Sequence, residues 1–272
     1  MENSLIERLE YKYLISINLM DSIRREISPF VELDPYAKKQ ENGRYIVRTI
    51  YLDTSELECY HSKIEGINIR KKYRIRGYDY LTDNDVVFLE IKRKCFDHIS
   101  KNRAPLYYQN IQSFFNTKNF DENILSFSQN GKERKDAQKF LFHYYSKGLH
   151  PVVLIIYERE AFFGKFDSSL RLTFDKNLRS RIFPSLDMLF DDEPVKFSMT
   201  QYFIFEVKFS NNLPAWLKSL LNRYNLKRRA LSKYIICIDS HKEPKIFSRS
   251  ICSHRLPTKK NLSKKAVYEY VK

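Results

Sequence analysis

Hydrophobic and polar residues alternate at every second position along much of this chain. Such alternation is typical of β-strands, whose successive side chains point to opposite faces. Several of these segments, such as YIVRTIYL, are also rich in the β-branched and aromatic residues that strands favour. The pattern predicts eight strands, over residues 8–15, 45–52, 68–78, 86–94, 152–163, 170–174, 202–209 and 233–238.

Helical signals are fewer. Residues 20–27 and 215–224 predict helices, and the second follows Pro214, which suits the start of a helix. Residues 107–149 mix polar runs with AQKFLFHYY and predict helices inserted between strands. Because strands dominate and do not alternate with helices, we expect an α+β fold built on an antiparallel sheet or barrel. We expect one domain over residues 1–240, followed by a basic C-terminal tail or short helix over 241–272.

One face of several predicted strands is strongly charged. Within residues 68–78 every second side chain is cationic, and the positions between them are mainly apolar. Like charges this close repel unless something neutralises them. They could form a solvated outer face, or they could line a barrel interior that binds a polyanion; repetition over several strands favours the interior. The residues that share a face are Arg8, Glu10 and Lys12; Arg70, Lys72, Arg74 and Arg76; Glu90, Lys92 and Lys94; Tyr157, Arg159 and Ala161; Arg171 and Thr173; and Glu206 with Lys208.

Carboxylates stand among these cations, and they narrow the choice of polyanion. Arginine matches phosphate oxygens in pairs, and lysine supplies a compact charge. Glu10, Glu90 and Glu206 would add little to a nucleic-acid groove. They suit a metal–triphosphate complex, because Mg²⁺ or Mn²⁺ takes carboxylate oxygens and bridges phosphates. The pattern therefore favours a metal–triphosphate ligand over nucleic acid.

Composition agrees with a polyanion partner. Lysine and arginine number 48 against 33 acidic residues, a formal net charge of +15. The chain has 6 glycines and no GxxxxGK[ST] or GxGxxG segment, which argues against a glycine-rich nucleotide loop. Its four cysteines lack CxxC spacing and predict reduced thiols. No stretch reaches the roughly 18–20 apolar residues that span a bilayer, so we expect a cytoplasmic protein.

Eight segments in order resemble the VTC domain, the polyphosphate-polymerase branch of the triphosphate tunnel metalloenzyme (CYTH-like) superfamily. The resemblance covers roughly residues 5–240, and YLDT followed by RIRGY is its most specific part. It implies an eight-stranded antiparallel β-barrel tunnel with helices packed outside. The segments are RLEYKYLIS, YIVRTIYLDT, KIEGINIRKKYRIRGY, VFLEIKRK, YEREAFFG, RLTFD, FEVKF and LSKY.

The resemblance also implies an activity. A polyphosphate polymerase transfers the γ-phosphate of ATP to a growing inorganic polyphosphate chain, with Mn²⁺ or Mg²⁺ as cofactor. ATP and polyphosphate are thus the expected partners, and a membrane protein is a possible further one. Carried over to this sequence, the family pattern implies catalytic roles for Lys12, Arg74, Arg76, Lys92 and Lys233; substrate binding by Lys101, Arg103, Tyr157, Arg159, Arg171, Lys208 and Ser232; and metal binding by Glu206.

Two points leave alternatives open. The family commonly has a lysine two residues before the serine of LSKY, where this chain has Ala230, and Arg228 or Arg229 could compensate. A triphosphatase of the same fold would use the same cations to hydrolyse tripolyphosphate or a nucleoside triphosphate. A non-catalytic binder of polyphosphate or RNA would also explain the charge.

Overall fold

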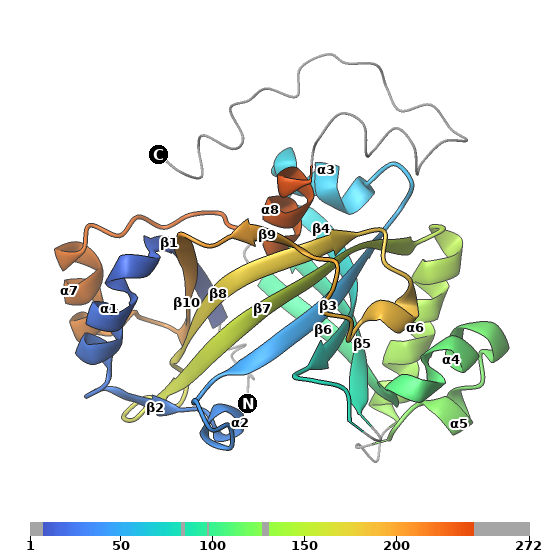
Figure 1. Ribbon diagram of the computed structural model, residues 1–272, viewed down its shortest axis with the longest axis horizontal. Helices are drawn as coiled ribbons and strands as arrows, with labels where there is room; N and C mark the ends of the chain where they lie inside the picture. Colours follow the sequence, from blue (N-terminus) through green and yellow to red (C-terminus); the bar gives the residue numbers. More distant parts are fainter. Residues whose placement is uncertain (1–7, 83–84, 97, 127–130, 242–272) are drawn as a thin grey trace, which may run out of the picture.

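The computed structural model describes residues 8–82, 85–96, 98–126 and 131–241 (Figure 1). An antiparallel sheet forms its centre, with the main strand order β1-β10-β8-β7-β3-β4-β5-β6, and with β2 and β9 paired to β7 and β8. The strands are β1 (Arg8–Ser16), β2 (Val31–Leu33), β3 (Tyr45–Asp53), β4 (Ile69–Tyr78), β5 (Val86–Cys95), β6 (His98–Tyr107), β7 (His150–Gly164), β8 (Arg171–Ile182), β9 (Lys196–Met199) and β10 (Tyr202–Ser210).

Helices flank the sheet on several sides (Figure 1). Those at one end come from the first and last thirds of the chain, and those at the other end come from the predicted insertion. The helices are α1 (Met20–Ile27), α2 (Pro35–Lys38), α3 (Glu58–Ile64), α4 (Ile111–Thr117), α5 (Phe120–Asn123), α6 (Lys132–Ser146), α7 (Ala215–Arg223) and α8 (Lys233–Ser240).

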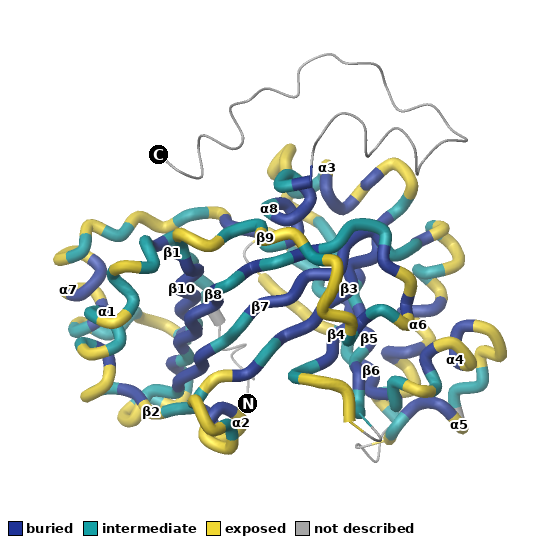
Figure 2. The backbone as a smooth tube through the Cα atoms, viewed as in Figure 1, coloured by how far each residue is buried: buried dark blue, intermediate teal, exposed yellow. Residues whose placement is uncertain are grey.

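Most apolar residues of the main strands are buried, and buried residues follow the strands of the sheet (Figure 2). On β10, Phe203, Phe205 and Val207 form one core together with Ile23 of α1 and Leu220 of α7. A second, larger core joins the apolar positions of β3 to β7 to α4, α6 and α8. Because side chains alternate along a strand, burying one face under helices leaves the charged positions together on the other face.

Seven of the eight predicted strands are confirmed, and one is wrong. Residues 233–238 form helix α8, whose start Ser232 caps by accepting a hydrogen bond from the Ile235 backbone N–H. A short apolar run is compatible with either a buried strand or a buried helix. Here Tyr234 and Ile238 are buried within α8. The eighth strand of the main path is β6, which the pattern missed because this edge strand is polar and contains Pro105, tolerated at a sheet edge.

The sheet curls into a half-barrel whose charged face lies inside. Within the described residues, the edge strands β1 and β6 share no ladder. An ion pair crosses the interior instead, from Lys92 of β5 to Glu10 of β1 at 3.2 Å. Helix α8 lies against the inner face, because Tyr234 stacks on Tyr51 with ring centroids 5.0 Å apart, and Tyr51 pairs directly with the inward Arg74. The prediction that the helices pack outside the barrel therefore does not hold for α8, which covers one end of the interior.

The predictions for the cysteines and for the C-terminal tail concern residues that the structure describes only in part. Cys59, Cys95 and Cys237 are free thiols, as predicted, and Cys252 lies outside the described residues. The predicted tail over 241–272 lies outside them too, apart from His241. Among the helices of the described chain, none combines the length and apolar character that a bilayer crossing needs.

Candidate functional site

The strand register brings the predicted site residues onto one surface, the inner face of the half-barrel. Directly opposed pairs include Lys12 with Glu206, Arg159 with Asp175, and Glu90 with Arg103. The interpretation of these cations as a solvated outer face is wrong, because the outer face is the one buried under helices. Residues on the inner face or reaching it from α8 are Lys12, Arg74, Arg76, Lys92, Lys101, Arg103, Tyr157, Arg159, Arg171, Glu206, Lys208, Ser232 and Lys233.

The interior contains two adjoining cavities, which share Glu10, Lys92 and Ile99. We call the first, of about 350 Å³, the Glu90 chamber, after the carboxylate that pairs with Arg74, Arg76, Lys101 and Arg103 of its lining. Its wall contains the aromatic rings of Tyr45 and Tyr78. Its charged lining residues, apart from Glu10, are all cations: Arg74, Arg76, Lys92, Lys101, Arg103, Arg159, Arg171 and Lys208.

Glu90 is the centre of a charge cluster drawn from three strands. Its side chain is 1% exposed and lies 2.7 Å from the Arg74 guanidinium, 3.2 Å from Arg103 and 3.3 Å from Lys101. Burial acts to raise the pKa of Glu90, but the cations, Arg74 and Arg76 foremost, lower it well below its usual range. The carboxylate is therefore ionised, and it fixes the direction in which these cations point.

Asp175 and Asp34 hold the cations on the opposite wall. Arg159 makes a bidentate pair with Asp175 at 2.6 and 2.8 Å, and Lys233 at the start of α8 reaches the same carboxylate at 2.5 Å. Arg171 pairs with Asp34 at 3.0 Å. Both Arg159 and Lys233 lie over the ring of Tyr157. Each guanidinium is thus anchored on one side, which leaves its remaining N–H groups for a ligand.

Glu10 lines both chambers, and it shares the cations Lys12 and Lys208 with its neighbour Glu206. Lys12 contacts Glu10 at 2.6 Å and Glu206 at 3.6 Å, and Lys208 contacts Glu206 at 2.9 Å. Burial and the neighbouring Glu206 act to raise the pKa of Glu10, but Lys12, Lys92 and Lys208 outweigh them and lower it to about 2. The pKa of Glu206 is lowered as well, by Lys208 and Lys12 against the effect of burial. Both carboxylates are ionised.

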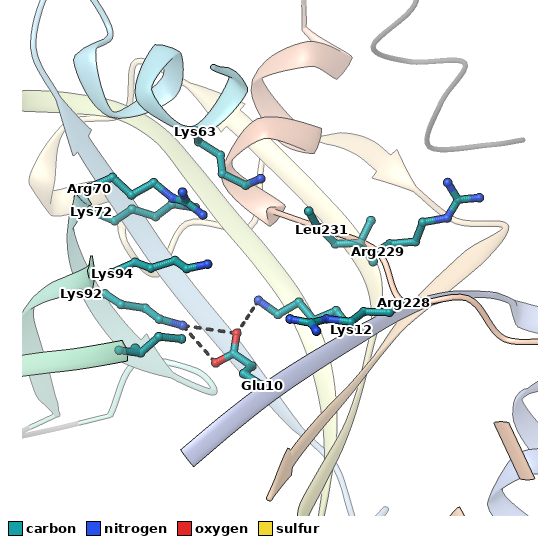
Figure 3. Close-up of a pocket in the computed structure, with 12 residues that line it drawn as sticks. Glu10, Lys12, Lys63, Arg70, Lys72, Lys92, Lys94, Arg228, Arg229 and Leu231 are labelled. Atoms are coloured by element: carbon teal, nitrogen blue, oxygen red, sulfur yellow. Dashed lines mark hydrogen bonds and ion pairs between the residues drawn. The ribbon is translucent and has the colours of Figure 1, made fainter. Parts of the chain in front are cut away.

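The second cavity, of about 460 Å³, we call the Lys72 chamber (Figure 3). Side chains from α3, β4 and β5 point across it toward Lys12 and Arg228. Lys72 donates a hydrogen bond to the Ser232 hydroxyl at 2.7 Å. Burial lowers the pKa of Lys72 well below its usual range, and the nearby Lys12 and Lys92 lower it further. The lining residues are Glu10, Lys12, Lys63, Arg70, Lys72, Lys92, Lys94, Ile99, Arg228, Arg229, Ala230 and Leu231.

Several residues of the two cavities were not among the site residues predicted from the sequence. Arg70, Lys72 and Lys94 were placed on the inward face by alternation, and the same rule extended by two positions from Thr173 would have found Asp175. Lys63 gave no such signal because it projects from α3. Ala230 stands where the family commonly has a lysine. In this chain Lys72 of β4 places a cation beside Ser232, and Arg228 and Arg229 line the same cavity.

The described residues offer two carboxylates, Glu206 and Glu10, to a metal ion. Within the described residues, no group of three or more His, Cys, Asp or Glu side chains is arranged to bind one. Glu206 and Glu10 share the ammonium of Lys12 and are both ionised, and Glu10 lines both cavities. One or two carboxylates with phosphate oxygens completing the shell is how proteins commonly hold Mg²⁺. The donor set thus fits a metal that arrives with a phosphate ligand.

Comparisons with known proteins agree with the geometry. The vacuolar transporter chaperone complex subunit 4 of Schizosaccharomyces pombe is 27% identical over 218 residues, which is 65% of this chain and 29% of that protein. Subunit 2 of the same complex from Saccharomyces cerevisiae is 25% identical over 167 residues, or 56% of this chain and 20% of that protein. The chain thus spans less than a third of the length of either relative.

A solved structure and a family model complete the comparison. The PH1819 protein from Pyrococcus horikoshii OT3 is similar with a TM-score of 0.43 and 12% identity, over 85% of this chain and 98% of that one. The VTC domain model matches residues 7–242, a range that contains all of the described residues. This match confirms the resemblance drawn from the eight ordered segments, and the chain belongs to the VTC domain family.

Proposed function

We propose that this chain is a polyphosphate polymerase, which transfers the γ-phosphate of ATP to the end of an inorganic polyphosphate chain. The observation that carries the proposal is the Glu90 chamber, where cations from β4, β5, β6, β7 and β8 converge on one small cavity. Phosphoryl transfer asks a protein mainly for positioning and for stabilisation of negative charge. An enclosed array of fixed cations supplies both.

The transfer itself needs no general base. An oxygen of the terminal phosphate of the chain forms a bond to the γ-phosphorus, and the bond from that phosphorus to the β–γ bridging oxygen breaks. ADP leaves with that oxygen and its electron pair, and no proton has to move because the attacking oxygen is already anionic. Arg74, Arg76, Arg159 and Arg171 would hold the triphosphate, and Lys12, Lys92 and Lys233 would align the acceptor.

Glu206, with Glu10 beside it, would hold Mn²⁺ or Mg²⁺ in this site. A bound metal would supply positive charge that offsets the negative charge of the phosphates during transfer. Lys12 and Lys208 neutralise these two carboxylates in the structure. The names of the two relatives, subunits of a vacuolar transporter chaperone complex, support a further proposal that this chain works with protein partners.

Incubating the purified chain with ATP and Mn²⁺ tests the activity. Polymerase activity predicts long phosphate polymers on a gel, digestible by an exopolyphosphatase, together with ADP. Free orthophosphate without polymer would indicate the triphosphatase of the same fold. Salt-sensitive binding to RNA that ignores ATP and metal would indicate a non-catalytic binder. The exposed Lys218→Ala variant on α7 serves as a control for the loss of one positive charge far from the interior.

A further inference from the structure

Exposed apolar side chains gather at the end of the sheet where β4 begins and β5 turns into β6. On the strands, Ile69 is 64% exposed and pairs directly with Cys95, and the next residue, Phe96, is 60% exposed. Single apolar residues on a surface need no explanation, but a group of large ones marks a contact site. We call this group the apolar tip; its members are Ile67, Ile69, Phe96 and Ile99.

Phe96 has a backbone conformation that does not suit a large side chain. Its φ of 53° lies in the left-handed region, which glycine adopts freely and a bulky residue rarely adopts. Strand β5 ends at Cys95 and β6 begins at His98, so Phe96 belongs to the short turn between them, and Asp97 of that turn lies outside the described residues. Strained residues cluster where function needs the side chain. An exposed ring at this position therefore points to a use for the ring itself.

Two rows of cations follow directly behind the apolar tip. In the first row Arg70 of β4 pairs with Lys94 of β5, and in the next row Lys71 pairs with Arg93. Side chains alternate along a strand, so the first pair points to the inner face of the sheet and the second pair to the outer face. At about 3.4 Å per residue, both rows lie within roughly 7 Å of Ile69 along the strand. The apolar tip thus has positive charge behind it on both faces.

The charge of this region is positive on balance. Residues 63–71 and 93–101 contain six lysines and arginines against two acidic residues, Glu65 and Asp97. Arg70 and Lys94 line the Lys72 chamber. Lys71 and Arg93 lie on the opposite face of the same strands, so a ligand in the interior does not account for them.

Apolar side chains with cations behind them on both faces match the chemistry of an anionic lipid surface. A peripheral protein buries apolar groups about 5–10 Å into the boundary between headgroups and acyl chains, and its lysines and arginines bind the acidic headgroups above. A bilayer surrounds such a tip on every side, whereas a rigid protein groove would cover one face. Nucleic acid would bind the cations but would leave the isoleucines in water.

We propose that the apolar tip and the cations behind it form a membrane-docking site, which inserts shallowly into a bilayer surface that contains anionic lipids. Phe96 and Ile69 enter the apolar boundary, and Lys71 and Arg93 bind lipid headgroups. The inference does not depend on the proposed polymerase, because Phe96 and Ile69 line neither chamber. A chain that makes no polymer would still dock.

Flotation of the full chain with lipid vesicles tests the proposal. The chain should bind vesicles of phosphatidylcholine mixed with phosphatidylserine, and it should bind pure phosphatidylcholine vesicles much more weakly. Phe96→Gly should weaken binding to the mixed vesicles about tenfold or more, because a buried aromatic side chain is lost. Since glycine adopts the positive φ, the melting temperature of this variant should not fall. Phe166→Ser, at an 86% exposed phenylalanine between β7 and β8, should bind like the wild type.

The net charge of +15 attracts the chain to any anionic surface, so charge needs a control of its own. Arg93→Glu and Lys218→Glu change the net charge equally, but only Arg93 lies behind the apolar tip. Arg93→Glu should weaken binding to the mixed vesicles about fivefold more than Lys218→Glu does. Equal losses in the two variants, or a Phe96→Gly chain that binds as tightly as the wild type, would overturn the site.

A fluorescent probe measures the insertion itself. Trp216 is the only tryptophan of the sequence and stacks on Phe30, so Trp216→Phe gives a background without tryptophan that keeps an aromatic ring there. In this background, Phe96→Trp should shift its emission to the blue on mixed vesicles and should be quenched by brominated lipids, and Phe166→Trp should show neither change. A probe at position 96 that stays in water, or a dimer in gel filtration that Phe96→Gly abolishes without any vesicle binding, would overturn the proposal.

Discussion

The two chambers of the interior hold similar cations in opposite electrostatic states. Around Glu90 and Asp175 the guanidiniums are tied to buried carboxylates, so their geometry is fixed before any ligand arrives. In the second chamber Lys72 donates to the Ser232 hydroxyl and not to a carboxylate, and burial and the nearby Lys12 and Lys92 lower its pKa. Fixed geometry suits a reacting triphosphate, which must be aligned. A cation paired with a neutral hydroxyl suits a chain that has to be attracted and can slide.

Removing Glu90 should give the largest effect. Glu90→Gln leaves several buried cations without their common partner, and breaking a buried ion pair from one side costs about 3–5 kcal/mol. The free energy of unfolding, measured by urea denaturation, should fall by that amount. A loss below about 1 kcal/mol would show that the cations of this chamber do not depend on Glu90 for their stability.

Arg74→Ala should have the second-largest effect, on the affinity for the triphosphate ligand. The variant removes a charge-assisted hydrogen bond to phosphate, worth about 2 kcal/mol, or roughly thirtyfold in the dissociation constant. Calorimetry with adenylyl imidodiphosphate and Mn²⁺ measures it, with Lys218→Ala as the matched control. Unchanged affinity in Arg74→Ala would mean that the triphosphate does not contact this chamber.

Lys72→Met should stabilise the protein, in contrast to Glu90→Gln. It replaces a half-buried ammonium, surrounded by like charges, with an apolar side chain of similar length, so the free energy of unfolding should rise by about 1 kcal/mol. A destabilised variant would indicate that Lys72 is neutralised in a way that the comparison of the two chambers does not include. Thermal or urea unfolding in the absence of phosphate is the appropriate measurement.

The pH dependence of phosphate binding should be the smallest effect. Burial lowers the pKa of Lys92 to about 8, with Lys12 contributing in the same direction. Lys92 is therefore charged below about pH 8, and affinity for tripolyphosphate should fall several-fold as pH rises from 7 to 9. Lys92→Arg keeps its charge throughout this range and should flatten the curve, which also controls for titration of the ligand itself.

Lys92 also predicts the direction in which the free energy of unfolding changes with pH. The folded-state pKa of Lys92 lies below its ordinary value of 10.5, so the unfolded chain binds more protons between these values. The contribution of Lys92 to the free energy of unfolding should therefore increase as pH rises from about 8 toward 10.5. Lys92→Arg should remove this contribution, and a wild-type chain that matches the variant at every pH would contradict the shifted pKa.

The inward residues could be predicted from sequence because a strand has a period of two. Once Arg74 points inward, Arg70, Lys72 and Arg76 must follow, and the register carries the rule to Glu90 and its neighbours. The segment at 20–27 was also predicted with its bounds intact, because its apolar positions follow a helical period.

What could not be predicted depends on contacts distant in sequence. The split of the interior into two chambers results from Glu10 meeting Lys92 across the sheet, and no local pattern encodes that meeting. Helix α8 was mistaken for a strand because its apolar run is buried by the curled sheet around it. Lys63 reaches the interior only because α3 packs near the mouth of the Lys72 chamber.

A crystal structure with adenylyl imidodiphosphate and Mn²⁺ tests the central claim most directly. The account predicts that the triphosphate lies in the Glu90 chamber against Arg74, Arg76 and Arg159, with an anomalous manganese peak beside Glu206 and the Lys72 chamber still open. A nucleotide bound outside the half-barrel, or one whose triphosphate fills the Lys72 chamber, would contradict it.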